Sequence, residues 1–485
     1  MPTVNVRIRT TALPASHAPL DLYTRLGSQL GTDQVFLFEH PVGSEPGRMA
    51  ALVGWGRLLQ LRVYANRVEI DGLASLTALA RAAAAAAGLR EDDVGGAWRG
   101  PSPSFWELLR ATQRLFELEG ESPCDGFSFG FVTVIGYGAA GHMERLRADT
   151  DPAKADITLT LFRTTAHYAA AGEPPVLVHA AADGWPAAPE VDLSPLVGAD
   201  EPVPAPEVYE VRDSMEREDF LHRVRRCLAH IADGEVDQIQ VGHRIDVRSS
   251  LSPVDVYRRL RARNPSPHMY LLPHATGTVV GASPELLFRM SDDTLTLRSI
   301  AGTAHRSGDP QTDERRVAEL VKDPKERAEH LMLVDLARED LAAVTGPGNP
   351  RVEKLMTVEA FSHVFHMIST VSGKLPPDAD VWSALCSAFP AGTVTGVPRP
   401  RAMELIGTLE IEPRGLYAGA VGLLDVRGWN ELALCIRTIV HDGAVYSTQS
   451  SAGIVEGSDP AAEWNETMAK MSAAYWALTG KELLA

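Results

Sequence analysis

Apolar residues along this chain form two kinds of segment, short runs typical of strands and longer segments typical of helices. In the first half, apolar runs such as DQVFLFEH (33–40) and GFSFGFVTVIGYG (126–138) predict strands, whereas the Ala-rich segment 75–89 predicts a helix. The second half continues the mixture, with a helix and then a strand over 215–247, a helix at 252–264, and short strands at 268–273, 277–283 and 286–290. Hairpin-like strand clusters interrupted by helices predict an α+β fold, with mixed or antiparallel sheets flanked by helices.

One stretch lacks this periodicity. Residues 187–210 are rich in Pro, Ala and Asp, which is typical of a linker or a surface excursion. We therefore expect an N-terminal region at 1–186, a linker at 187–213 and a C-terminal catalytic region at 214–485.

Charge and composition narrow the function. The formal net charge of −17 argues against a nucleic-acid binder, because binding to phosphates needs concentrated Lys and Arg. No apolar run is long enough to span a bilayer, and the first residues lack the apolar core of a signal peptide, so a cytoplasmic protein is expected. The four cysteines form no CxxC pair and no nucleophile elbow, so this chain is not expected to hydrolyse glutamine.

Two pairs of glutamates stand out. Glu326 and Glu329 are three residues apart in DPKERAEHLMLVDLARED (323–340), and Glu463 and Glu466 repeat the spacing in DPAAEWNETMAKM (459–471). Residues at i and i+3 are neighbours on a helix, so like charges there repel unless solvent or a cation relieves them. A solvated face is the simple interpretation. Two facing pairs would instead hold a divalent cation through oxygen ligands.

Four further features are candidates for chemistry. Segments 298–309 and 389–406 both contain Ala-Gly-Thr, and the small residues of 447–460 predict a turn that aims backbone N–H groups at a carboxylate. Arg437 is embedded in the apolar, strand-like ELALCIRTIV, where pairing with a structural carboxylate or with a ligand is expected equally. His363 and His366 lie among apolar residues and are either hydrogen-bonded core residues or a proton-transfer group.

These segments together resemble the chorismate-utilising enzymes, most specifically the large subunit of anthranilate synthase and its relative aminodeoxyisochorismate synthase. The resemblance rests on 323–340, VEAFSHVFHMISTV, FPAGTVTGVPRPRAMELI, GLYAGAVGLLD and SAGIVEGSDPAAEWNETMAKM, and it extends to HAPLDLYTRL and GFSFGFVTVIGYGAAGHMERL in the N-terminal half. It implies that the four glutamates surround a Mg²⁺ ion, which grips the ring carboxylate of chorismate.

The resemblance also implies roles for other residues. Thr393 and His366 are expected near the substrate ring, with His366 as the candidate for proton transfer and Glu326 counted as catalytic as well as metal-binding. The remaining residues expected to bind the substrate are Arg437, Tyr417, Ser451, Ala452, Gly453, Ala301, Gly302, Thr303 and Lys470.

Two positions discriminate among members of this family. Members that add water at C2 of chorismate carry a lysine where this chain has Gln238, and members that make 4-amino-4-deoxychorismate carry a lysine where it has Ala301. The resemblance therefore implies amination at C2, with ammonia from a separate glutamine amidotransferase subunit.

The resemblance leaves two end products open. Because His366 and Thr393 are present, anthranilate plus pyruvate is preferred over release of 2-amino-2-deoxyisochorismate, and a non-catalytic regulatory or scaffold subunit is the alternative of another class. His40 and His268 replace a small hydroxyl residue and a tyrosine of the family's tryptophan pocket, so feedback inhibition by tryptophan is expected to be lost. Gln-Ser-Ser-Ala-Gly (449–453) also departs from the family's Gln-Ala-Gly-Ala-Gly.

Overall fold

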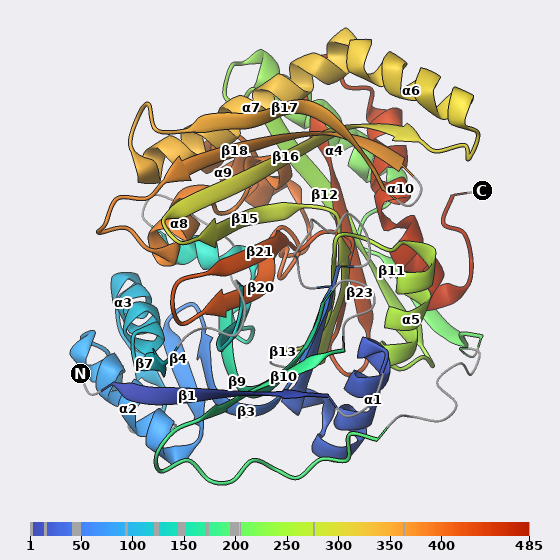
Figure 1. Ribbon diagram of the computed structural model, residues 1–485. Coiled ribbons are helices and arrows are strands. Elements are labelled where there is room, and N and C mark those ends of the chain that lie inside the picture. Colours follow the sequence, from blue (N-terminus) through green and yellow to red (C-terminus); the bar gives the residue numbers. More distant parts are fainter. Residues whose placement is uncertain are drawn as a thin grey trace.

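The computed structural model describes residues 3–13, 17–40, 50–92, 96–120, 126–143, 151–169, 174–194, 203, 205–274, 277–361 and 364–484. Within these ranges the strands pair into one connected sheet network flanked by helices (Figure 1). Among the described strands, the pairings are antiparallel except for that of β1 with β7. The predicted α+β class is confirmed.

The helices are α1 (Pro19–Leu30), α2 (Ala74–Ala86), α3 (Ser102–Gln113), α4 (Arg217–Ala232), α5 (Pro253–Arg263), α6 (Pro310–Lys322), α7 (Pro324–Thr345), α8 (Val381–Ala388), α9 (Arg399–Leu409) and α10 (Pro460–Thr479). A 3₁₀ turn, η3 (Gly392–Val394), carries one of the candidate threonines. The helices predicted at 75–89, in 215–247 and at 252–264 correspond to α2, α4 and α5.

The N-terminal strands are β1 (Val4–Ala12), β2 (Val35–Glu39), β3 (Ala51–Val63), β4 (Arg67–Gly72), β5 (Arg90–Glu91), β6 (Trp98–Arg99), β7 (Phe116–Glu119), β8 (Gly130–Ile135), β9 (Ile157–Tyr168) and β10 (Val176–Ala181). The strands that follow are β11 (Val208–Asp213), β12 (Gln238–Ser249), β13 (His268–His274), β14 (Gly277–Ser283), β15 (Leu286–Ser291), β16 (Thr294–His305), β17 (Arg351–Ala360), β18 (Val364–Lys374), β19 (Gly396–Val397), β20 (Ala420–Asp425), β21 (Asn430–Leu434), β22 (Thr438–His441) and β23 (Tyr446–Ile454).

Strands from the two halves of the chain are interleaved. β2 pairs with β13, and β8 pairs with β20. The final six residues of the expected linker are not irregular: they form β11, which pairs with β12 along the sheet. The division into regions on either side of 187–213 stays a prediction.

The two helices that carry the glutamate pairs begin in the same way. Asp323 caps α7, its carboxylate accepting hydrogen bonds from the amides of Lys325 and Glu326, and Asp459 caps α10 through the amide of Ala462. A proline follows each aspartate, at a position where the missing N–H costs nothing. The Asp-Pro pairs therefore place Glu326 and Glu463 in the first turn of each helix.

These helices lie on different parts of the sheet. α7 packs against β16 and β18, whereas α10 packs against β23 and against α4 and α5 (Figure 1). No helix in the described part of the chain is both long and apolar enough to cross a bilayer.

Candidate active site

The glutamates of α7 and α10 act on one another electrostatically. Burial raises the pKa of Glu326, and the charges of Glu329 and, from the other helix, Glu466 raise it further. Burial also raises the pKa of Glu463, beside Glu466, and its Oε2 atom is buried with no hydrogen-bond partner among the residues that the structure describes. Like charges are thus concentrated between the two helix starts, which is the situation that a cation would relieve.

The four carboxylates fit a Mg²⁺ ion by donor type. An all-oxygen set suits this metal, which keeps several water ligands and needs few protein ones. Three or more of their oxygens do not gather within 4.8 Å of one another in the described chain. The orphaned Oε2 of Glu463 is the observation that supports the fit.

A bulge in β16 brings the first Ala-Gly-Thr segment beside this acidic group. Ala301 pairs with Met367 and Thr303 with His366, so Gly302 between them is the extra residue of the bulge. Gly302 has φ +78°, a conformation that glycine adopts without strain. A Cβ atom added there would lie 3.2 Å from Oε2 of Glu326. The bulge therefore gives the backbone a close approach to that carboxylate.

The apolar setting of Arg437 predicted a position within a strand, and this prediction is wrong. Arg437 occupies the break between β21 and β22 with φ +51°, which turns the chain out of the ladder. Burial lowers the pKa of its guanidinium, and the charges of Tyr417, Glu466 and Glu285 offset part of that effect. Both carboxylates are bonded elsewhere: Glu466 pairs with Lys470 at 2.5 Å, and Glu285 accepts from Thr393 at 3.0 Å.

This arrangement leaves Arg437 available to an anionic ligand. Among the residues that the structure describes, its guanidinium forms no ion pair within 4.0 Å. A half-buried and partly desolvated cation in this state favours a bound carboxylate, which would restore the lost solvation.

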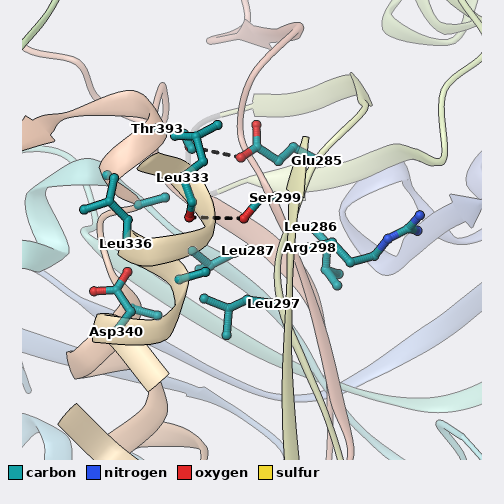
Figure 2. Close-up of a pocket in the computed structure, with 14 residues that line it drawn as sticks. Glu285, Leu286, Leu287, Leu297, Arg298, Ser299, Leu333, Leu336, Asp340 and Thr393 are labelled. Carbon is teal, nitrogen blue, oxygen red and sulfur yellow. Dashed lines mark hydrogen bonds between the residues drawn. The ribbon is translucent and has the colours of Figure 1, made fainter. Parts of the chain in front are cut away.

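Glu285 is a functional candidate that the sequence analysis missed. It lies between β14 and β15, and burial raises the pKa of its carboxyl group to about 7, while Thr393, Arg437 and Lys470 act to lower it. Figure 2 shows its carboxyl group bonded to Thr393 at one end of a pocket that extends along α7 to Leu336 and Asp340. Its only sequence signal was a carboxylate after Ser-Pro between two apolar strand predictions.

Two glutamines of β12 approach β23. Gln238 and Gln240 share one face of the strand, and a Cβ atom on Gly453 would lie 3.0 Å and 2.8 Å from their respective Nε2 atoms. Gln238 is 5 % exposed, and its Oε1 atom has no hydrogen-bond partner in the described part of the chain. An orphaned amide oxygen costs free energy unless a ligand completes it.

The predicted turn at 447–460 is wrong for most of its length. Residues 451–453 are extended in β23 and pair in register with 240–242 of β12, because the small side chains allow close strand pairing. The strand ends at Ile454, and only the residues after it lead as a loop to α10.

A chain of hydrogen bonds organises the predicted substrate-binding residues at this strand. The hydroxyl group of Ser451 donates its hydrogen to Oε1 of Gln240 at 2.6 Å. Because a hydroxyl group has a single hydrogen, the hydroxyl group of Tyr417, 2.6 Å from Oγ of Ser451, is the donor in that second bond. Lys470 donates to the backbone oxygen of Ser451 at 2.8 Å. Arg414, itself paired with Glu410 at 2.7 Å, lies over the ring of Tyr417. Tyr417 thus supports the strand through Ser451.

His366 lies next to the Gly302 bulge. Its Nδ1 atom is 3.1 Å from Oγ1 of Thr303 and 3.3 Å from the carbonyl oxygen of Gly302. Burial lowers the pKa of the imidazole below its usual value, the hydrogen bond with the Gly302 carbonyl offsets part of that effect, and Arg437 lowers the pKa further. The ring is therefore neutral at pH 7 and suited to accept a proton. His363 lies outside the described residues, and Thr393 bonds to Glu285 instead of His366.

The described cysteines do not have the properties of nucleophiles. Cys227 and Cys435 are buried, and burial raises the pKa of both thiols, that of Cys227 to about 12. Cys386 is an exposed residue, but desolvation of its thiol raises the pKa to about 11. Cys124 lies outside the described residues.

Comparison with known proteins identifies the class. The family model described as "chorismate binding enzyme" matches residues 74–475. This protein therefore belongs to the chorismate-binding enzyme family, and the predicted relationship is confirmed.

Relatives span two named activities. A 2-amino-4-deoxychorismate synthase from Streptomyces globisporus is 42% identical over 489 residues, covering 99% of this chain and 98% of the relative. Anthranilate synthase component 1 from Streptomyces coelicolor is 50% identical over 268 residues, covering 55% of this chain and 52% of the relative. The fold is similar to that of anthranilate synthase component I from Streptococcus pneumoniae, with a TM-score of 0.68, 24% identity, and coverage of 96% of this chain and 99% of that one.

Proposed function

We propose that this enzyme aminates chorismate at C2 with ammonia and releases 2-amino-4-deoxychorismate, the compound also called 2-amino-2-deoxyisochorismate. The observation that carries the proposal is Glu285, whose carboxyl group has its pKa raised by burial to about 7 and is bonded to Thr393 at one end of the pocket, within electrostatic reach of Arg437. The whole-length relative named for this product supports it.

The chemistry requires one proton donor and one nucleophile. Ammonia attacks C2, the ring double bonds shift, and the C4–O bond breaks. Glu285 donates a proton to the departing C4 oxygen, which leaves as water, and the proton lost by the new C–N centre restores the acid. A group with a pKa near the working pH is efficient at such transfer.

In this proposal Gln238 binds the nucleophile, ammonia, and Arg437 orients the substrate. The amide of Gln238 hydrogen-bonds ammonia without protonating it, while Arg437 holds a substrate carboxylate. Glu326, Glu329, Glu463 and Glu466 would hold Mg²⁺, which supplies charge withdrawal through the ring carboxylate when bound.

Release of the amino compound departs from the sequence-based preference for anthranilate. The relative matched over its whole length carries the former name, whereas the anthranilate synthase component from S. coelicolor is matched over about half. Thr393, expected to serve elimination, is bonded to Glu285. Anthranilate plus pyruvate is the second candidate, favoured by the neutral imidazole of His366.

The nitrogen source is proposed to be a separate glutamine amidotransferase. The raised thiol pKa values of Cys227, Cys386 and Cys435 argue against glutamine hydrolysis by these residues. Several relatives are named as component 1, which implies a second component for those enzymes.

The decisive experiment incubates the purified chain with chorismate, an ammonium salt and Mg²⁺, with Glu285→Gln as the inactive control. Mass spectrometry should detect an amino product that keeps its enolpyruvyl group, and a coupled assay should detect no pyruvate. Anthranilate with equimolar pyruvate would establish the second candidate instead. Failure of the wild type to consume chorismate would reject amination and favour a scaffold subunit.

A further inference from the structure

Three side chains with metal-binding donors meet at a second place in the sheet. His40 directly follows β2, His268 begins β13, and Glu431 lies in β21. All three are buried, with exposed fractions of 7%, 5% and 7%, and one donor atom of each lies within 4.8 Å of the others. They are distinct from the four glutamates of α7 and α10.

Hydrogen bonds fix the orientation of two of these groups. Nδ1 of His40 is 2.6 Å from the carbonyl oxygen of Pro267, and because a carbonyl only accepts, that nitrogen carries the hydrogen. Arg289 donates to Oε2 of Glu431 at 2.9 Å from the paired strand, which turns Oε1 toward the imidazoles. Bonds of this kind typically orient the ligands of a metal ion.

One donor atom of each residue lies at a distance from the others that suits a shared cation. Nε2 of His40 is 3.6 Å from Oε1 of Glu431, and Nδ1 of His268 is 3.5 Å from the same oxygen. Zinc binds such atoms at about 2.0–2.1 Å in a tetrahedron, so two ligand atoms on one ion are separated by about 3.4 Å. The observed separations match that edge.

We propose that His40, His268 and Glu431 bind a zinc-class divalent ion, which ties β2, β13 and β21 together. Two imidazoles and a carboxylate suit this metal, whereas the all-carboxylate group of the active site suits Mg²⁺. The ion is structural: it joins positions 40, 268 and 431 of the chain and takes no part in the amination chemistry.

The test measures binding and stability instead of turnover. Chelator-treated protein is mixed with Zn²⁺ in the presence of excess Mg²⁺, so that Mg²⁺ already occupies the four glutamates of α7 and α10. The protein is then dialysed, and the amount of zinc bound per chain is measured. The wild type should retain one zinc ion and melt at a higher temperature with it. His268→Gln and Glu431→Gln should lower zinc affinity by at least about tenfold and abolish the increase in Tm.

A matched control uses a histidine elsewhere. His222 is exposed on α4, so His222→Gln should bind zinc like the wild type. Wild type that retains no zinc, or ligand variants that bind it as tightly as the wild type, would overturn the proposal. If the variants fail to fold, Co²⁺ added to the wild type decides: the visible absorption of tetrahedral cobalt supports the site, and its absence rejects it. Neither result depends on whether the enzyme aminates chorismate.

Discussion

At the scale of single residues, Glu285 links pH to both activity and stability. Burial raises the pKa of its carboxyl group from 4.5 to about 7, so the folded protein holds this proton more tightly than the unfolded chain. Stability associated with this group is therefore present below pH 4.5 and is lost as pH rises through about 7.

Substitution of Glu285 by Gln should separate these two effects. Turnover should fall by at least about a hundredfold because the proton donor is lost. Above pH 7, denaturant unfolding should show the variant to be more stable than the wild type, by roughly 3 kcal/mol at most. The wild-type rate, divided by the concentration of free ammonia, should decline above pH 7. A rate that is flat with pH would remove Glu285 from the proton-donor role.

Glu326 tests the metal proposal at the same scale. Its pKa is raised by burial and by the nearby carboxylates, so Glu326→Gln should relieve repulsion and leave the fold intact. Turnover should be lost, and Mg²⁺ should raise the Tm of the wild type but not of the variant. Glu339→Gln, on an exposed position of the same helix, is the control and should behave like the wild type. Full activity of Glu326→Gln in EDTA-treated buffer would contradict the assignment.

At the scale of elements, the pairing of β12 with β23 fixes the two glutamine amides. Gly453 leaves room for them, so Gly453→Ala should push both amides aside while the fold survives, because they are the ends of flexible side chains. A shift of about 1 Å at such a site can cost about a hundredfold in rate. Gly407→Ala in α9, where a Cβ atom meets nothing within 4 Å, should leave the rate unchanged. Equal rates for both variants would show that the amide of Gln238 does not position ammonia.

At the scale of the whole molecule, both halves of the chain contribute to one sheet and neither shows a nucleophilic cysteine among its described residues. The purified chain should therefore use ammonium salts at raised pH but not glutamine, and an added amidotransferase subunit should restore the use of glutamine. Measurement of product formed per glutamine consumed checks this. Glutamine-dependent amination by the chain alone would refute the need for a partner.

The sequence by itself determined the family, the α+β class and the starts of the helices that carry the glutamates. These properties depend on local patterns: apolar spacing selects strands and helices, and the Asp-Pro pairs at 323–324 and 459–460 cap and start α7 and α10. The expected replacement of lysine by Gln238 was also readable locally, although its buried amide oxygen was not.

Only the tertiary structure decided which groups meet. Glu285 becomes an acid with a pKa of about 7 because the surrounding fold buries it, and Arg437 leaves its apparent strand because the backbone turns there. Likewise, the separation of His40, His268 and Glu431 along the chain hides their convergence, since strand pairing between distant segments brings them together. Desolvation and long-range pairing are properties of the whole fold, and for that reason no local pattern revealed them.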